Sequence, residues 1–352
     1  MSDAQLTTGG GPGPGPRVAQ IVFRIAVIVI LLVPVAVAIA ILLTAQGGTK
    51  SDARPLAGSA NASPARAVPA AASSSPNTDA TTPAPTAGVI PAAPGVSEGD
   101  RAAATKAADA AVVKLLSYSS TSLDEALSRA RSVSTAAYGR TYADFWSQMV
   151  APNAAKEQTS VTAMVKASGV VTARPRHVDV LAFVNQTTES TAASERSQVS
   201  LTRVTLTMVF RHGTWLVDRI TADASAPVDE PDPARAAVLK AADNFADVVT
   251  CYASGTIDHD LRKMNELMTP HMRADFAAMD IRSLVNNTHV TSIGEALQAA
   301  LVSQDDTRAE TLVSADATVT TGRQTRHRHF RWTVHLERVD GRWLVADFTP
   351  VV

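Results

Sequence analysis

The sequence predicts an α+β protein in which two related domains follow a membrane anchor. Residues 25–43 carry no charged side chain, which is typical of a transmembrane helix. Two later segments each begin with apolar residues at helical spacing and continue with strand-like alternation. Both segments end on Gly-x-Trp-Leu-Val, which contains Trp215 in one segment and Trp343 in the other. Helices followed by antiparallel strands are typical of α+β domains.

The length and the composition limit the classes to which the chain can belong. A chain of 352 residues has room for about two domains and additional segments. It carries 32 Lys and Arg against 33 Asp and Glu, a net charge of -1, which argues against the basic domain typical of nucleic-acid binding. The single cysteine, Cys251, excludes an internal disulfide. Because Cys251 lies in an apolar helical stretch, we expect a small core residue rather than a reactive thiol.

Residues 18–44 are predicted to form a single transmembrane anchor. At about 1.5 Å per residue, a helix over residues 25–43 would span roughly 29 Å, close to the ~30 Å hydrocarbon core of a membrane. Arg17 and Arg24 on the N-terminal side favour a cytoplasmic N-terminus, so residues 1–17 would form a cytoplasmic tail. The alternative is a cleaved signal peptide, whose apolar core is usually shorter, about 7–15 residues.

Residues 45–100 are predicted to form a disordered linker. Ala, Pro, Ser, Thr and Gly dominate this segment, and apolar periodicity is absent from its sequence. Such a segment cannot bury enough apolar surface to fold. A flexible chain of this length spans roughly 40 Å, so the folded part would be tethered outside the cytoplasm within reach of neighbours in the same membrane.

The folded region is predicted to divide at a proline-rich segment into two domains, residues 101–225 and 234–352. Pro227, Pro231 and Pro233 would interrupt regular structure between them. Each domain is expected to pack N-terminal helices on the concave face of a curved antiparallel sheet. The apolar positions of the first helix recur at spacings of four and three: Ala104, Ala108, Val112 and Leu115.

Matching positions in the two domains indicate a duplication. Tyr118 and Tyr252 follow the first helix at the same point of each domain. Each domain ends on a hairpin whose turn contains Gly213 or Gly341, and the Asp-Gly pair of the second turn is a strong hairpin signal. The strand-like alternation before these turns involves Val204, Leu206, Met208 and Phe210 in the first domain and Phe330, Trp332, Val334 and Leu336 in the second.

Several short segments together resemble one protein family. They are residues 115–118 (Leu-Leu-Ser-Tyr), 123–127 (Leu-Asp-Glu-Ala-Leu), 156–158 (Lys-Glu-Gln), 167–171 (Ala-Ser-Gly-Val-Val), 183–188 (Phe-Val-Asn-Gln-Thr-Thr) and 213–218 (Gly-Thr-Trp-Leu-Val-Asp). In this order, behind an anchor and an Ala/Pro-rich spacer, they resemble the Mce-associated membrane proteins, which are accessory proteins of the mammalian-cell-entry (Mce) lipid transporters of actinobacteria. The domains also resemble the cone-shaped fold of the nuclear transport factor and ketosteroid isomerase superfamily. The family pattern has one such domain, and the second copy here lacks the Phe-Val-Asn-Gln-Thr-Thr segment.

The resemblance implies a non-enzymatic accessory subunit that assembles or stabilises an Mce-type lipid import complex. It would be a single-pass protein of the cell membrane, with the bulk of the chain outside the cytoplasm. Its partners would be Mce transporter components in the same membrane, with lipid as a further candidate and no nucleic acid. The alternatives are a lipid- or sterol-binding module that uses the cone pocket and, after it, an isomerase-like enzyme. An apolar cavity of roughly 300–1,000 Å³ would favour the lipid-binding alternative, whereas a cone filled by Trp215 and Trp343 would favour the accessory role.

The sequence contains no pattern of an assembled catalytic site. Isomerases of the cone fold use a buried carboxylate base with a tyrosine or an acid that binds the developing oxyanion. Tyr138 and Tyr142 lie four residues apart on one helix face, which indicates an ordinary core stripe, and Asp179 alternates with valines and should face solvent. We therefore predict no enzyme, no catalytic residue, no cofactor and no metal site. The residues weighed for catalysis are Tyr118, Tyr138, Tyr142, Asp144 and Asp179.

A basic segment near the end of the chain is the candidate binding surface. A hairpin rich in arginine would bind lipid head groups or an acidic partner surface. The alternative is a solvated strand edge whose charge prevents pairing with other chains. His327 and His329 would share one strand face, but the neighbouring arginines oppose a metal cation there. The candidate binding residues are Arg323, Arg326, Arg328 and Arg331.

Overall fold

The computed structural model describes residues 96–191, 197–222 and 229–352. The predicted cytoplasmic tail, the predicted anchor and residues 45–95 of the predicted linker lie outside these ranges. Among the residues that are described, no helix is both long and apolar enough to cross a membrane. We call the described residues up to 222 the first half and those from 229 onward the second half.

The first half begins with a long helix, which is followed by shorter helices and then by long strands. The long helix α3 (Glu98–Leu116) starts where the Ser97 side chain accepts a hydrogen bond from the Asp100 N–H. The helices that follow are α4 (Leu123–Ser132), α5 (Ala136–Phe145) and α6 (Ala151–Glu157), with a π-helical turn at Trp146–Val150. The strands are β1 (Tyr118–Ser119), β2 (Thr159–Arg174), β3 (His177–Ser190), β4 (Ser197–Arg211) and β5 (Thr214–Ala222).

The second half repeats this order of elements. Its long helix α7 (Pro233–Thr250) has Pro233 in the first turn, where a backbone N–H has no intrahelical partner, and the Asp232 carboxylate accepts a hydrogen bond from the Ala234 N–H. The shorter helices are α8 (Ile257–Glu266), α9 (Pro270–Ala277) and α10 (Ile281–Thr288). The strands are β6 (Tyr252–Ala253), β7 (Val290–Gln304), β8 (Arg308–Thr321), β9 (Gln324–Val339) and β10 (Arg342–Pro350).

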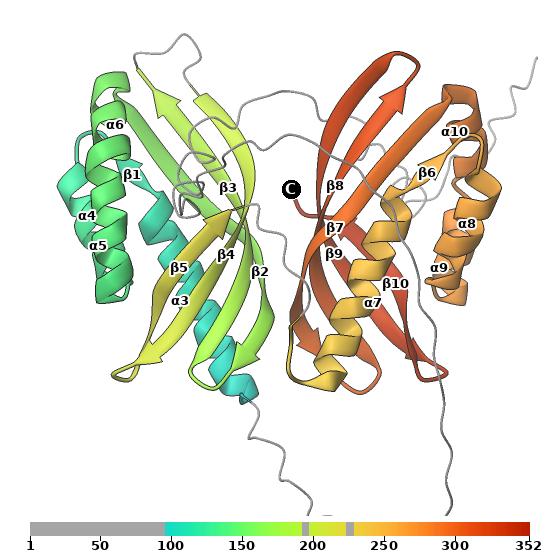
Figure 1. The fold of residues 1–352 in the computed structure, drawn as a ribbon, viewed down its shortest axis with the longest axis horizontal. Coiled ribbons are helices and arrows are strands. Elements are labelled where there is room, and N and C mark those ends of the chain that lie inside the picture. Colours follow the sequence, from blue (N-terminus) through green and yellow to red (C-terminus); the bar gives the residue numbers. More distant parts are fainter. Residues whose placement is uncertain (1–95, 192–196, 223–228) are drawn as a thin grey trace, which may run out of the picture.

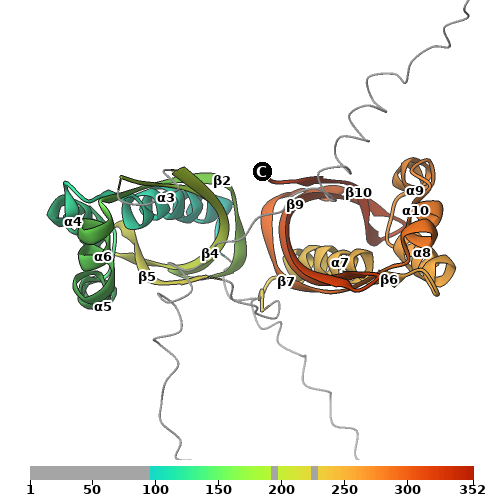
Figure 2. The same cartoon turned by 90° about the horizontal axis from the view of Figure 1, so that it is seen from above.

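The long strands join into an antiparallel sheet that runs through both halves in the order β10-β9-β8-β7-β2-β3-β4-β5. The halves meet in the sheet where Val170 of β2 pairs with Leu301 of β7. Figure 1 shows the two parts of the sheet meeting at the centre of the molecule, with the short helices on the outer sides. In Figure 2 each part of the sheet curves around one long helix, α3 or α7. The predicted α+β class with an antiparallel sheet is confirmed.

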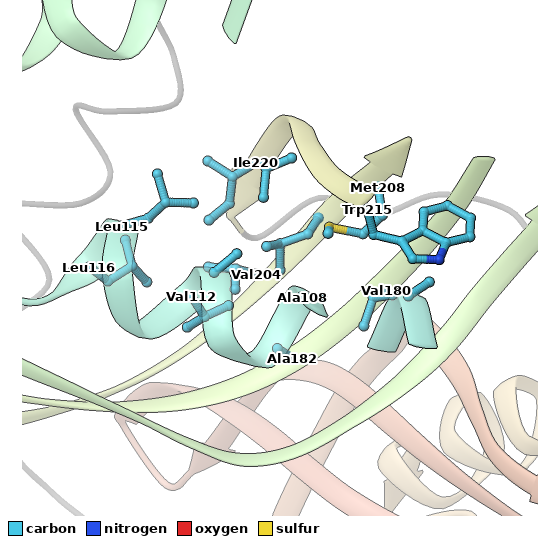
Figure 3. Close-up of a cluster of buried hydrophobic side chains, with 14 of the residues drawn as sticks. Ala108, Val112, Leu115, Leu116, Val180, Ala182, Val204, Met208, Trp215 and Ile220 are labelled. Atoms are coloured by element: carbon cyan, nitrogen blue, oxygen red, sulfur yellow. The ribbon is translucent and has the colours of Figure 1, made fainter. Parts of the chain in front are cut away.

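Each half has a hydrophobic core between its long helix and the concave face of its part of the sheet. Figure 3 shows part of the first core, in which Ala108 and Val112 of α3 lie beside Val204 of β4. Trp215 is buried in this core, and Trp343 packs, half-buried, against the core of the second half. A helix and tightly packed side chains therefore occupy the concave face of each half.

The local environment of Cys251 differs from the expectation. The prediction that this cysteine lies in the core is wrong, because its side chain is exposed. Cys251 is the residue at which α7 ends, and its Sγ lies 3.1 Å from the carbonyl oxygen of Gly294, to which the thiol donates. The apolar residues before Cys251 belong to the helix face that packs on the sheet, whereas Cys251 itself has already left the helix.

Gly294→Ala is expected to lower the free energy of unfolding by about 2–3 kcal/mol, because the site has no room for a methyl group. A Cβ atom at Gly294 would lie 2.5 Å from Thr250 Cβ and 2.8 Å from the carbonyl oxygen of Asp316. Urea unfolding of the full chain, followed by tryptophan fluorescence, measures the effect. Gly255→Ala is the control, since nothing lies within 4 Å of its Cβ position. Equal stability of the two variants would contradict the close packing of α7 on β7.

Candidate partner-binding surface

The β8–β9 hairpin carries the four arginines that the sequence singles out. Its turn contains Gly322, which adopts a φ of +60°, and lies at the top of the molecule in Figure 1. Arg323 and Arg326 are exposed and Arg328 is half-buried, whereas Arg331 is only 8% exposed. The structure therefore places three of the four arginines toward the tip of the hairpin and separates Arg331 from them.

Alternation along β9 places Arg326 and Arg328 on the same strand face as Phe330, which packs against the core of the second half. The charge of Arg328 acts on Tyr252 at the end of α7. Burial raises the pKa of Tyr252, and a hydrogen bond with Ser292 and the charge of Arg328 offset part of this effect. Arg326 and Arg328 thus form a basic rim at the hairpin end of the second half, while Arg323 extends it at the turn.

The two histidines of the hairpin lie on the opposite strand face, as expected, but each has its own partner. Nδ1 of His327 lies 3.2 Å from Oγ1 of Thr318, and Nδ1 of His329 lies 2.9 Å from Oδ1 of Asp316. Across the part of the chain that the structure describes, no group of three or more His, Cys, Asp or Glu side chains could hold a metal ion. The histidines thus extend the polar surface of the hairpin on its second face.

Arg331 lies between the two halves instead of on the exposed hairpin. Its guanidinium donates to Val184 O and Thr202 O at 3.3 Å each, and to Asn185 Oδ1 and Val351 O at 3.0 Å each. The same group lies 5.5 Å from the centre of the Phe183 ring, within the range of a cation–π contact. Burial lowers the pKa of Arg331 to about 10, so the group stays charged at neutral pH. Arg331 therefore holds the halves together, which differs from the prediction that grouped it with the partner-binding arginines.

A second buried arginine at the contact between the halves was missed by the sequence reasoning. Nη1 of Arg203 on β4 donates to Oδ1 of Asp316 on β8 at 3.1 Å, and Arg203 is only 7% exposed. Burial alone would raise the pKa of Asp316. The hydrogen bonds from His329 and Arg203 and the positive charges of these two side chains outweigh burial, so the pKa lies below its usual value. The sequence did contain a signal for this residue. Arg203 precedes Trp215 by the same number of residues as Arg331 precedes Trp343, so the two arginines occupy equivalent positions of the duplication.

The tyrosines weighed as catalytic residues belong to the core. The Tyr142 hydroxyl donates to the carbonyl oxygen of Leu115 at 2.7 Å, and its ring stacks on Trp146. Burial raises the pKa values of Tyr138 and Tyr142 well above the usual tyrosine range. Tyr118 packs edge-on against Trp146, and Asp144 is exposed. Asp179 lies outside the core and accepts a hydrogen bond from the Thr207 hydroxyl at 2.7 Å, so these residues do not converge on one site.

Two open hollows lie outside the packed cores. One, of about 550 Å³, lies between α3 and β2, and Val113, Met164, Lys166 and Asp109 are among the residues that line it. The other, of about 270 Å³, lies at the β7–β8 turn, with Asp305, Glu310 and His335 among its lining residues. The first hollow has the more apolar lining, and its volume lies within the range of about 300–1,000 Å³ that is typical of ligand-binding cavities, whereas the second hollow is smaller than this range.

A pair of carboxylates on α7 is a further feature that the sequence reasoning missed. Oδ1 of Asp247 accepts a hydrogen bond from the Ala296 N–H at 2.6 Å, at a point where the register of β7 and β8 shifts. Asp243 lies one helical turn earlier, and burial together with the charge of Asp247 raises its pKa from 3.8 to about 7. The positions that correspond in α3, counted back from the helix end, hold Asp109 and Val113. The second half therefore carries an acidic pair where the first half has a single carboxylate.

No protein-family model matches the sequence. Among solved structures, the chain is similar to an IcmL-like type IV secretion system protein of Legionella pneumophila, at 11% identity and a TM-score of 0.30, over 35% of this chain and 95% of that one. It is also similar to CagV, a VirB8 homolog of Helicobacter pylori, at 13% identity and a TM-score of 0.29, over 34% and 96%. An Ntf2-like protein involved in plasmid conjugation matches at 10% identity and a TM-score of 0.25, over 70% and 95%. Similarities at these TM-scores support no conclusion about function.

Two proteins of Mycobacterium tuberculosis match the sequence itself. The uncharacterized protein Rv1362c is 33% identical over 123 residues, which cover 35% of this chain and 56% of that protein. The chain thus spans about half the length of this relative. The outer membrane protein Rv1973 is 32% identical over 119 residues, which cover 34% of this chain and 73% of that protein. Because the second match extends over most of Rv1973, the chain belongs to the protein family of this Mycobacterium tuberculosis outer membrane protein.

Proposed function

We propose that the chain is a non-enzymatic accessory subunit that assembles or stabilises an Mce-type lipid import complex. The observation that carries this proposal is the basic rim of the exposed Arg323 and Arg326 and the half-buried Arg328, which lies on a half whose concave face is filled by α7. Because the concave face is filled, contacts with a partner would have to use the outer surface of the chain. A cluster of arginines with one sign of charge favours an acidic protein surface or anionic head groups.

The proposal includes a place in the cell. The charge-free segment of residues 25–43 supports a single membrane anchor with the N-terminus in the cytoplasm. The family relationship with a protein named as an outer membrane protein supports a location of the folded halves outside the cytoplasm. The partners would be Mce transporter components in the same membrane, which the tethered halves reach across the linker.

The test is an affinity purification of the full chain from membranes in mild detergent, with the co-purifying proteins identified by mass spectrometry. The double variant Arg323→Glu/Arg326→Glu is expected to recover at least about tenfold less of the partner subunits, because it reverses the charge of the rim. The matched control is Arg338→Glu/Arg342→Glu, which makes the same charge change at the exposed β9–β10 turn, at the opposite end of β9. Equal recovery with both double variants would contradict the role of the rim.

A lipid-binding module remains the second candidate, since the 550 Å³ hollow between α3 and β2 has apolar lining residues such as Val113 and Met164. Both side chains are exposed, at 42% and 59%. The same purification separates the candidates. Transporter subunits in the purified material favour the accessory role, whereas a chain that carries lipid and lacks protein partners favours the module. A Met164→Glu variant would then lose the lipid.

A further inference from the structure

The two halves meet through corresponding positions. The pairing of β2 with β3 shifts its register between Val165 and Ala167 and again between Val170 and Thr172. The pairing of β7 with β8 shifts at the equivalent places, between Ala296 and Gln298 and between Leu301 and Ser303. Val170 and Leu301 are therefore equivalent residues, each directly before the second shift, and they pair with each other where the halves join. A contact of a residue with its own counterpart lies on an axis of approximate two-fold symmetry.

The two buried arginines obey the same symmetry. Arg203 pairs with Phe183 in the sheet, and Asn185 follows Phe183 by two residues. Arg331 pairs with Ser314, and Asp316 follows Ser314 by two residues, so Arg203 corresponds to Arg331 and Asn185 to Asp316. Arg203 binds Asp316 at 3.1 Å, and Arg331 binds Asn185 at 3.0 Å. Each half thus inserts the same arginine into the same position of the other half.

An apolar centre lies on the convex faces between these arginines, and it too draws on both halves. It consists of Val171, Leu181, Phe183, Ala300 and Leu312, all buried. Gly169 of β2 lies against this centre, where an added Cβ would be 3.1 Å from Leu301 O and 3.2 Å from Ala300 Cβ. The glycine allows the two strands to cross closely. Buried apolar residues framed by reciprocal polar contacts are the arrangement of an isologous dimer interface.

We infer that the convex sheet face of each half is a self-recognition surface, and that the chain is a dimer of such domains fused into one polypeptide. The partner that this surface fits is a second domain of the same kind, supplied here by the other half. The reciprocal arginines and the crossing at Gly169 set the angle between the halves. One copy of the chain would thereby present two rigidly related domains to whatever it binds.

The test is to ask whether the halves stay together without a covalent link. In the full chain, purified in mild detergent, residues 223–228 are replaced by a specific protease sequence, and the cut protein is passed over a gel-filtration column. The two halves are expected to elute as a one-to-one complex. Separate elution of the cut, unsubstituted halves would overturn the inference.

A charge exchange keeps the test decisive even if one substitution perturbs folding. Arg203→Asp places a carboxylate opposite Asp316 and is expected to make the cut halves separate. Adding Asp316→Arg restores opposite charges at the same position and is expected to restore the complex. A complex that survives Arg203→Asp, or that Asp316→Arg fails to restore, would contradict the contact.

The reciprocal nature of the interface has its own test. Asn185→Asp places a carboxylate where the symmetry-related position has Asp316, next to Nη2 of Arg331. A charge-assisted hydrogen bond should then replace a neutral acceptor, so the cut halves are expected to separate at least about tenfold more slowly. An unchanged or faster separation would overturn the symmetry that relates Asn185 to Asp316.

Discussion

Arg331→Met is expected to lower the free energy of unfolding of the full chain by about 3 kcal/mol, because it removes the donor from buried acceptors. Methionine fills a similar volume, so the loss is one of hydrogen bonds and charge rather than of packing. Val184 O, Thr202 O and Asn185 Oδ1 would each lose the guanidinium as a partner. The Phe183 ring would lose its cationic neighbour. Urea unfolding at pH 7, followed by tryptophan fluorescence, measures the change.

The matched control for this experiment is Arg326→Met on the same strand. Arg326 is exposed, and the side-chain partner that the structure shows for it is the neighbouring Gln324, at 3.3 Å. Surface substitutions of this kind usually change stability by less than about 0.5 kcal/mol. A loss of similar size in both variants, or a negligible loss in Arg331→Met, would contradict the role of Arg331 in joining the halves.

The pattern of helices and strands was predictable because it depends on local periodicity. The spacing of Ala104, Ala108 and Val112 indicates a helix face, and the same residues are fully buried against the sheet. Gly213 and Gly341 have φ values of +80° and +79°, as their hairpin turns require. Such signals need only the residues next to one another in the chain. The positions of the core and of the turns follow from them directly.

The contact between the halves was not predictable in this way, because alternation along a strand shows only that a side chain points away from its own core. His327, Arg203 and Arg331 all point away from their own cores, yet His327 is exposed and the two arginines are buried against the other half. What distinguishes the buried arginines from the exposed side chain is contact with the other half of the chain, which is far away in sequence. Comparison of the two copies would have found the arginines, since the duplication keeps both at equivalent positions.

The acidic pair on α7 escaped notice for a related reason. Asp243 and Asp247 lie one turn apart, a spacing that is ordinary for the solvated face of a helix. Only the register shift of β7 at Ala296 brings a backbone N–H to Asp247 and leaves Asp243 desolvated beside it. A helix pattern cannot reveal which polar residues a distant strand will cover.

Asp243→Asn is expected to stabilise the chain at pH 8 by about 2–4 kcal/mol and to have little effect near pH 4. The pKa of Asp243 rises from 3.8 to about 7 on folding, so between these values the folded state binds a proton that the unfolded state has released. The folded state is therefore favoured at low pH, and this contribution is lost as the pH rises through about 7. Asparagine stays neutral at every pH, so the variant avoids burying a charge beside Asp247. Urea unfolding at a series of pH values from 4 to 8 measures the difference in stability.

Asp306→Asn is the control for this pH series. Asp306 is exposed at the β7–β8 turn, and its substitution by asparagine removes the same formal charge. The control should change the free energy of unfolding by less than about 0.5 kcal/mol across the series. A stabilisation by Asp243→Asn that is constant from pH 4 to pH 8 would show that the side-chain amide, and not the loss of a buried charge, is responsible. A destabilisation at pH 8 would mean that the ionised carboxylate has a partner at the α7–β7 contact, and the desolvation argument for Asp243 would then fail.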